Sequence, residues 1–264
     1  MNDLTNDQLN RYSRNIAIRE IGFEGQLIIR KSKVLIIGAG GLGSAASLYL
    51  AAAGIGTLGI IDQDRVELSN LQRQILHDTP SLGEEKVYSA ARRIRALNPD
   101  VEVRTWQEPF SVSNALTLLS EFDYILDCTD NFRAKFLIND AAVIGRKPFT
   151  HAGVLGFKGQ ALTWAPGREA PCLRCLLPEQ PTAQESPSSV EEGILGAVAG
   201  TFGTIQAVEV IKVLTGIGKP LLGRLLTCDA LSMEFRVVEV KPSPVCPLCS
   251  DIPKIKELKA DLYT

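Results

Sequence analysis

The stretch VLIIGAGGLG, residues 34–43, decides the fold class expected for this chain. Residues 34–37 are a continuous apolar run, as in a parallel strand buried on both faces. The run enters a G-x-G-x-x-G pattern at Gly38, Gly40 and Gly43, with Gly41 as a further glycine. Residues 42–53 then predict a helix that Gly54 ends. Such a strand–turn–helix unit lets the backbone approach a phosphate, and the helix N-terminus supplies free N–H groups.

Strands and helices alternate on either side of this unit. Further strands are expected at 57–61, 101–104 and 124–127, and a helix is expected at 84–97. This alternation predicts an α/β fold with a doubly wound, mainly parallel, Rossmann-like sheet. Ligands of such sheets bind beyond the C-terminal ends of the strands. The glycines after the first strand, Asp62 after the second and Asp130 after the fourth would therefore face one crevice.

The chain is expected to form a single unit over 1–264 with four parts. Thr5 and Gln8 have the spacing of a capping box and open the N-terminal helices of 1–32. A nucleotide-binding core over 33–155 precedes a mixed, partly antiparallel part over 156–250. That part is expected to contain strands at 160–164 and 225–227 and a helix at 200–214. The residues 178–192 are rich in Pro, Ser and Glu, which predicts a mobile loop. The polar tail of 251–264 is expected to fray.

Composition and charge exclude several classes of partner. The chain is 45% hydrophobic with a net charge of −2, so nothing favours binding to nucleic acid or to an anionic membrane. The polar N-terminus has no apolar core of a secretory signal, which predicts a cytoplasmic protein with reduced cysteines.

A second set of polar residues follows the strands and favours a triphosphate. Cations and amides would converge with one carboxylate on the phosphate side of the crevice, a set that suits ATP with Mg²⁺. These residues are Ser69, Asn70, Arg73, Lys86, Asp130 and Asn131. Each also has a simpler interpretation: Arg73 and Lys86 as solvated cations, and Asp130 as a helix cap.

The glycine pattern alone also fits an NAD-dependent oxidoreductase, with Asp62 bound to the ribose hydroxyls. Hydride transfer needs no charged cluster, and His77 and His151 are poor candidates for the acid of such an enzyme. His151 is interpreted as a packed or capping residue after the fifth strand, with substrate contact as the alternative. Cys128 and Cys228 are interpreted as buried and inert.

A series of motifs extends these patterns: GAGGLG at 38–43, D-x-D at 62–64, SNLQRQ at 69–74, GEEK at 83–86 and DCTDN at 127–131. Together with R-Y-x-R at 11–14, they resemble the MoeB/ThiF/HesA family, the bacterial relatives of ubiquitin-activating enzymes. The resemblance covers residues 9–249.

The resemblance implies an adenylyltransferase whose substrate is a ubiquitin-like sulfur-carrier protein of the ThiS or MoaD type. The carrier's C-terminal Gly-Gly carboxylate would attack the α-phosphorus of ATP, giving an acyl-adenylate for thiamine or molybdopterin synthesis. It implies a homodimer in which Arg14 reaches the partner's ATP. It also implies an Mg²⁺ ligand at Asp130, and ATP contacts at Gly41, Asp62 (with Asp64 in the same motif), Asn70, Arg73 and Lys86. The competing interpretations are a carrier-binding scaffold without catalysis and a peptide or other small substrate.

Four cysteines form two C-x-x-C pairs, Cys172 with Cys175 and Cys246 with Cys249. Four thiolates in two such turns are the usual tetrahedral Zn²⁺ site, and a redox role is the alternative. The resemblance implies a structural zinc. Many relatives also carry a cysteine in the loop before the long second-half helix, where this chain has Ser189 and no cysteine over 178–192. The protein is therefore expected to stop at the acyl-adenylate.

Overall fold

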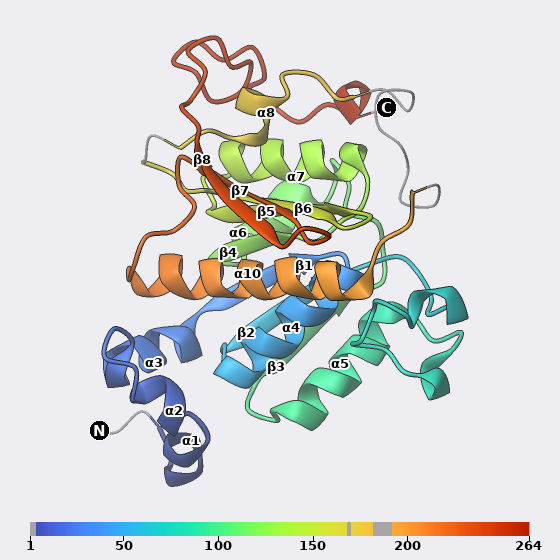
Figure 1. Cartoon of the computed structure of the whole chain (residues 1–264), viewed down its shortest axis with the longest axis vertical. Coiled ribbons are helices and arrows are strands. Elements are labelled where there is room, and N and C mark those ends of the chain that lie inside the picture. Colours follow the sequence, from blue (N-terminus) through green and yellow to red (C-terminus); the bar gives the residue numbers. More distant parts are fainter. Residues whose placement is uncertain (1–3, 168–169, 182–191, 264) are drawn as a thin grey trace.

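The computed structural model describes residues 4–167, 170–181 and 192–263. An eight-stranded sheet runs through it in the order β3-β2-β1-β4-β5-β6-β7-β8 (Figure 1). Its strands are β1 (Lys33–Ile37), β2 (Thr57–Ile61), β3 (Glu102–Trp106), β4 (Tyr124–Asp127), β5 (Phe149–Leu155), β6 (Lys158–Trp164), β7 (Arg224–Asp229) and β8 (Glu234–Glu239).

The sheet is mixed, as the sequence predicts. Strands β3, β2, β1, β4 and β5 are parallel to one another, whereas β5 through β8 pair antiparallel. The chain passes from β1 to β2 and β3 on one side of β1, and it then returns to β4 on the other side of β1. The strand order therefore reverses between β1 and β4, which is where sheets of this kind bind ligands.

Helices cover both faces of the sheet (Figure 1). Helices α4, α5 and α10 pack with α3 on one face, and α6 and α7 pack on the other. The α-helices are α1 (Asn6–Arg11), α2 (Ser13–Ile16), α3 (Gly22–Lys31), α4 (Gly41–Ala53), α5 (Lys86–Leu97), α6 (Ala115–Ser120), α7 (Phe132–Ile144), α8 (Leu173–Leu176) and α10 (Gly196–Thr215). Short 3₁₀ turns are η1 (Leu68–Asn70), η2 (Thr79–Ser81) and η3 (Ala260–Tyr263).

The apolar run of the first strand is explained by burial on both faces. Val34 and Ile36 pack into the core beneath α4, α5 and α10, while Leu35 and Ile37 pack into the core beneath α6 and α7. Successive side chains of a strand point to opposite faces, so a strand covered by helices on both sides has no polar position.

Among the described residues, α10 is the one helix long and apolar enough to cross a bilayer. Its composition follows from its place against α4 and the sheet, where Phe202 and Val210 are fully buried. Gln206 and Glu209 are also buried on this helix and make hydrogen bonds to the sheet. The packing of one face of α10 against α4 and the sheet therefore accounts for part of its hydropathy, whereas Val208 on the helix is exposed.

Most elements lie within a few residues of their expected positions, and the shifts have local causes. The helix expected from residue 84 begins at Lys86, because the Glu84 carbonyl accepts from Val66 N–H and Glu85 forms a β-bridge with Arg65. Helix α10 begins four residues earlier than expected, at Gly196. Strand β8 was not expected at all.

Two sequence-based expectations are wrong. His151 lies within β5, where it pairs in register with Asp127, and not after the strand. The C-terminal tail is not frayed up to residue 263: Tyr263 is buried and its hydroxyl donates to Asp140 Oδ2 at 2.9 Å. Asp140 also pairs with Arg174, so the tail closes a buried polar cluster. Most of the loop expected over 178–192, including Ser189, lies outside the described residues.

Candidate active site

A cleft of about 1590 Å³ opens at the C-terminal ends of the parallel strands. The residues after β1, β2 and β4 contribute to its wall, and β5 contributes His151. Nine of the predicted site residues line it, namely Gly38, Gly40, Gly41, Asp62, Asp64, Arg73, Lys86, Asp130 and Asn131. The doubly wound sheet therefore brings together side chains from three separate connections.

The glycine loop, residues 38–43, is built by close backbone contacts. Gly38 has φ of +98°, and a Cβ there would lie 2.8 Å from the Cys128 carbonyl oxygen. A Cβ on Gly43 would lie 2.0 Å from the Gly38 carbonyl oxygen, so Gly43 lets α4 start directly against the strand. Among the described residues, no side chain caps the N-terminus of α4. Its first N–H groups are therefore available to an anion in the cleft.

Two side chains hold this loop in place, the partly buried Asp62 and the buried His77. Asp62 Oδ2 accepts from Ala39 N–H at 2.7 Å, and Asp62 Oδ1 accepts from Asp64 N–H at 2.8 Å. His77 Nε2 lies 3.0 Å from the Ala39 carbonyl oxygen, and its Nδ1 lies 3.0 Å from Ser89 Oγ. Burial raises the pKa of Asp62, which Lys86 opposes, and burial lowers the pKa of His77. Neutral His77 therefore has a structural role: it fixes the glycine loop through its contact with Ala39.

Two cations line the same cleft as the glycine loop. Lys86 is buried, and its Nζ lies 2.9 Å from Asp64 Oδ2. Arg73 extends along the connection after η1 and donates to the Ser69 carbonyl oxygen at 3.1 Å. Both side chains are held by partners within the chain, and both residues line the cleft. This arrangement places positive charge beside the free N–H groups of α4.

Asp130 and Asn131 have different roles in the structure. Asn131 is the N-cap of α7, and its side-chain oxygen accepts from Ala134 N–H at 2.9 Å. Asp130 is exposed in the cleft, and its carboxylate has no hydrogen bond or ion pair with any residue that the structure describes. The capping interpretation of Asp130 is therefore wrong, and its carboxylate oxygens are available to a cation.

Four of the predicted site residues do not line the cleft. Gly43 acts through the packing described above, and Arg14 is exposed on α2. Asn70 Oδ1 accepts from Glu67 N–H at 3.1 Å, so its amide closes the η1 turn. Ser69 Oγ lies 3.3 Å from Glu67 Oε2 in the same turn.

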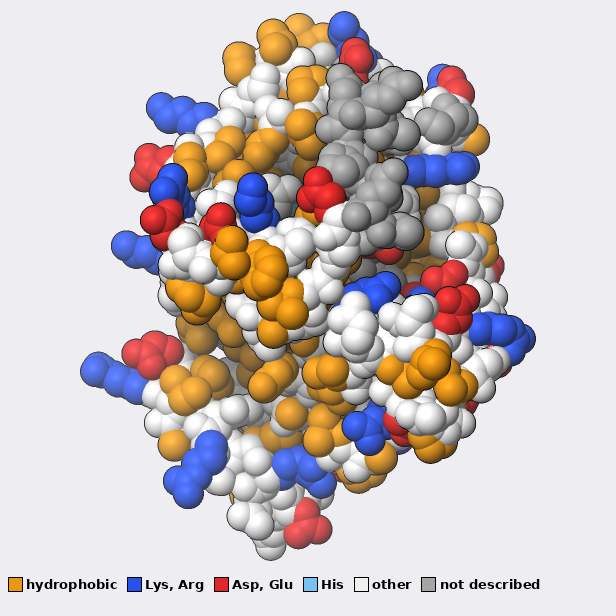
Figure 2. Space-filling view, turned by 45° about the vertical axis from the view of Figure 1, so that its right-hand side comes forward, with side chains coloured by type: hydrophobic (Ala, Val, Ile, Leu, Met, Phe, Trp, Pro, Cys, Tyr) orange, Lys and Arg blue, Asp and Glu red, His pale blue; other side chains and the backbone are white. Residues whose placement is uncertain are grey.

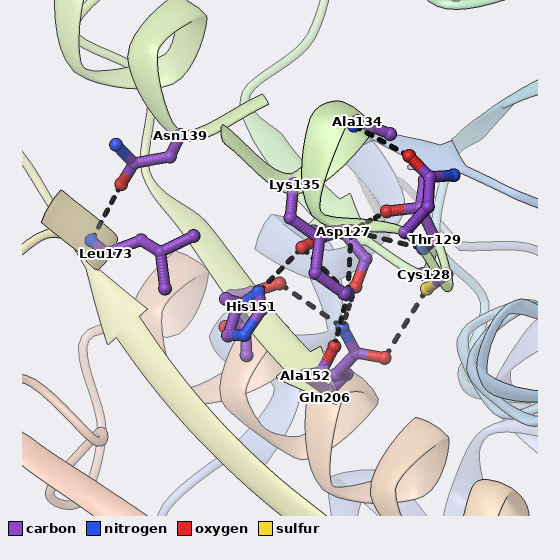
Figure 3. A network of polar contacts seen from close by, with 12 residues as sticks. Asp127, Cys128, Thr129, Ala134, Lys135, Asn139, His151, Ala152, Leu173 and Gln206 are labelled. Carbon is purple, nitrogen blue, oxygen red and sulfur yellow. Dashed lines mark hydrogen bonds and ion pairs between the residues drawn. The ribbon is translucent and has the colours of Figure 1, made fainter. Parts of the chain in front are cut away.

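A buried ionic network beneath the cleft was missed from the sequence (Figure 3). The Asp127 carboxylate lies 3.2 Å from Lys135 Nζ and 2.7 Å from His151 Nδ1. Lys135 also donates to the Ala152 carbonyl oxygen at 2.7 Å. The available signal was Lys135, a charged residue near the start of a helix that directly follows a buried strand.

Neighbouring side chains complete this network. Thr129 donates to Asp127 Oδ1 from both its N–H and its hydroxyl, at 3.1 and 2.7 Å. Burial alone would raise the pKa of Asp127, but Lys135 and His151 hold it well below its usual range. Gln206 donates to the Asp127 carbonyl oxygen and accepts from the Cys128 thiol. Burial raises the pKa of that thiol, which agrees with the inert role expected of Cys128.

The four paired cysteines converge although 70 residues separate the two pairs. Their sulfur atoms all lie within 4.8 Å of one another. Cys172 Sγ lies 3.7 Å from Cys246 Sγ, and Cys175 Sγ lies 3.3 Å from Cys249 Sγ. A tetrahedral Zn²⁺ with Zn–S bonds of about 2.3 Å separates its sulfur atoms by about 3.8 Å. The cluster therefore has the donor set and the size of a metal site.

On the face shown in Figure 2, acidic and basic side chains are interspersed. The described residues form no extended basic patch on this face. On this face, the described residues therefore offer no basic surface for a polyanion.

Comparisons with known proteins agree on the family and the activity. The model of the ThiF family matches residues 12–248. A sulfur carrier protein adenylyltransferase of Thermus thermophilus is 42% identical over 258 residues, covering 96% of this chain and 95% of the relative. The adenylyltransferase and sulfurtransferase MOCS3 of Anopheles gambiae is 43% identical over 256 residues. This chain spans 58% of the MOCS3 relative's length, and 97% of this chain takes part in the match.

Solved structures agree with the fold. The structure of PaaA is similar with a TM-score of 0.76 at 27% identity, over 90% of this chain and 75% of that one. The structure of MccB from E. coli in complex with MccA-N7isoASN gives a TM-score of 0.81 at 23% identity, over 94% of this chain and 76% of that one.

Proposed function

This chain belongs to the ThiF family and is an adenylyltransferase, and we propose that it uses ATP and Mg²⁺ to activate the C-terminal Gly-Gly carboxylate of a ubiquitin-like sulfur-carrier protein. Residues 33–155 would bind the nucleotide, and residues 156–250 would receive the carrier. The product would be an acyl-adenylate with release of pyrophosphate. This activity would serve thiamine or molybdopterin synthesis, in the cytoplasm.

The placement of the nucleotide follows from the cleft. The uncapped N-terminus of α4 would receive phosphate oxygens, and the ribose would lie toward Asp62 at the end of β2. The phosphates would then extend from β1 toward β4, where Asp130 lies. A single exposed carboxylate together with phosphate oxygens is a common ligand set for Mg²⁺ in nucleotide enzymes. Asp130 therefore fits an Mg²⁺ ligand.

Catalysis in this proposal is mainly electrostatic. The attacking carboxylate is already ionised, so it needs no base, but it must approach a polyanion. Arg73 and Lys86 would offset that repulsion and stabilise the charge that develops on the pentacovalent α-phosphorus and on pyrophosphate. Fixing the flexible tail of the carrier in line with the phosphorus supplies the orientation.

The cleft has room for such a tail beyond the nucleotide. Its wall continues from His151 on β5 to Gln160 on β6 and Thr227 on β7. A carrier docked at this antiparallel side would pass its C-terminus along the cleft toward the α-phosphate. A homodimer completes the proposal, because Arg14 is exposed and lies outside this chain's own cleft, where it is free to reach a partner's nucleotide.

The four-cysteine cluster fits a structural Zn²⁺. Cys172 and Cys175 lie at the start of α8, and Cys246 and Cys249 lie in the segment after β8. The metal would tie the C-terminal segment to the body of the protein, and it would supply no chemistry in the cleft. Because no cysteine occurs over 178–192, the chain itself would stop at the acyl-adenylate.

One observation carries this proposal: Arg73, Lys86 and Asp130, which has no partner among the described residues, lie in the same cleft as the glycine loop. The test is ATP–pyrophosphate exchange with purified Gly-Gly carriers of the ThiS and MoaD types. Arg73→Ala and Asp130→Ala should abolish the exchange, since each removes one part of the charge balance. Arg93→Ala, an exposed arginine on α5, is the matched control and should exchange normally. Normal exchange by Arg73→Ala or Asp130→Ala would refute the assignment.

No structural observation favours the NAD-dependent oxidoreductase. His77, one of its two candidate acids, is bound on both ring nitrogens within the loop scaffold. The adenylyltransferase relatives account for the same glycine pattern.

A further inference from the structure

His151 is a buried histidine of the cleft that the adenylation chemistry does not use. Its side chain is 4% exposed, and it lines the cleft beside the turn after β4. The Nδ1 atom lies 2.7 Å from Asp127 Oδ2. The Nε2 atom has no hydrogen-bond partner among the residues that the structure describes. This ring therefore has one nitrogen anchored and one nitrogen available to a ligand.

The neighbouring groups determine which nitrogen of the His151 ring carries the hydrogen. A carboxylate accepts, so Nδ1 bears the hydrogen and Nε2 presents a lone pair. Protonation of Nε2 is opposed by burial and by Lys135, which together lower the pKa of His151. The Asp127 carboxylate is already paired with Lys135, so an imidazolium would leave this buried group with a net positive charge. His151 is therefore a fixed hydrogen-bond acceptor.

A fixed acceptor restricts the ligand. It cannot accept from an ionised carboxylate or from a phosphate oxygen, because neither carries a proton. It requires an N–H or O–H donor. The candidate donors in the proposed complex are the hydroxyl and amino groups of the nucleoside and the peptide N–H groups of the carrier tail.

The register of the sheet separates these candidates. The end of β2 at Ile61 pairs with Ile37 of β1, Ile37 pairs with Asp127 of β4, and Asp127 pairs with His151 of β5. Three strand spacings of about 4.8 Å place His151 about 14 Å from the strand end that precedes Asp62. A ribose at Asp62 is too far away to donate. In the proposed complex, the phosphates would fill the intervening space over β1 and β4.

We propose that His151 Nε2 accepts a hydrogen bond from a backbone N–H of the carrier's C-terminal Gly-Gly segment and so positions its carboxylate for attack. This assignment rests on the proposed function. It makes His151 a residue that binds the peptide part of the substrate next to the phosphates, with Asp127 and Lys135 as the groups that hold its ring.

The test removes each partner of this hydrogen bond separately. On the enzyme, His151→Ala removes the acceptor. On the carrier, semisynthesis replaces one glycine of the tail by glycolate, which exchanges the amide N–H for an ester oxygen at nearly the same shape. Each of the two glycines is replaced in turn. Initial rates of ATP–pyrophosphate exchange give KM for the carrier and KM for ATP with all pairs of enzyme and carrier.

We expect His151→Ala to raise KM for the carrier by about 2- to 10-fold, the range for one hydrogen bond, with KM for ATP as the internal comparison. One of the two ester carriers should show the same loss with the wild-type enzyme. That ester should cost nothing further with His151→Ala, because the two changes remove the same bond.

Two results would overturn the inference. Ester carriers that bind the wild-type enzyme as tightly as the all-amide carrier would refute it without any protein variant, even if His151→Ala fails to fold. Equal and additive losses from the two changes would also refute it. These outcomes differ from failure of the proposed function, in which the wild-type enzyme gives no exchange with any all-amide carrier and both conclusions fall.

Discussion

Replacing Lys135 by methionine should destabilise the protein strongly, because it leaves the Asp127 carboxylate buried without its cation. Lys135 Nζ lies 3.2 Å from Asp127 Oδ2, and the side chains are 7% and 1% exposed. Methionine keeps the length of the aliphatic stem, so the change removes charge and hydrogen bonds more than volume. The perturbation therefore isolates the electrostatic term.

The expected magnitude follows from what remains around Asp127. Loss of one partner of a buried ion pair typically costs about 3–5 kcal/mol of unfolding free energy. His151 and Thr129 still donate to the carboxylate, which favours the lower end of that range. The Ala152 carbonyl oxygen also loses a donor, worth about 1 kcal/mol. We expect a total loss of about 3–4 kcal/mol.

The measurement is urea-induced unfolding followed by the fluorescence of the two tryptophans. Lys256→Met, at an exposed lysine, is the matched control and should lie within about 0.5 kcal/mol of the wild type. The double variant Lys135→Met with Asp127→Asn leaves no unpaired charge, so it should be more stable than Lys135→Met alone. A loss below about 1 kcal/mol in Lys135→Met would refute the reasoning.

Three further results are expected. Gly43→Ala should lower the unfolding free energy by about 3 kcal/mol and weaken ATP binding, because its Cβ would lie 2.0 Å from a backbone oxygen. The control Gly200→Ala, where a Cβ on α10 would meet open space, should be neutral or stabilising in the same urea titration. Both histidines have a lowered pKa in the folded protein, so the unfolded chain binds more protons below about pH 6.5. The unfolding free energy should therefore fall by up to about 1.4 kcal/mol per histidine and pH unit between pH 7 and pH 5.5. Equal urea midpoints at the two pH values would contradict this. Elemental analysis should find one zinc per chain and much less in Cys172→Ser; a wild-type content far below one would reject the metal site.

The parallel half of the fold could be predicted from the sequence because its signals are local. A run of apolar residues at 34–37 specifies a strand buried on both faces, and the glycines that follow specify the turn into α4. Both signals depend on neighbours within ten residues. The capping box at Thr5 is equally local, and the structure confirms it.

Strand β8 could not be predicted, because all six of its residues are at least partly exposed and its hydrophobic positions face no core. Without burial on one face, a strand loses the alternation that reveals it. The same limit applies to the polar side chains of the cleft: the sequence named Asp130 and Asn131 together, but only the cap geometry separated their roles.

The sequence by itself determined the family motifs, the nucleotide loop and each of the two C-x-x-C pairs, because each is a pattern of residue types at short spacing. Only the tertiary structure decided that Lys135 and His151 meet on Asp127, and that Tyr263 binds Asp140 across 123 positions of the chain. The physical reason is that a buried charge is stable only beside a partner, and the chain brings such partners together through strand pairing and helix packing. Spacing along the chain does not encode that proximity.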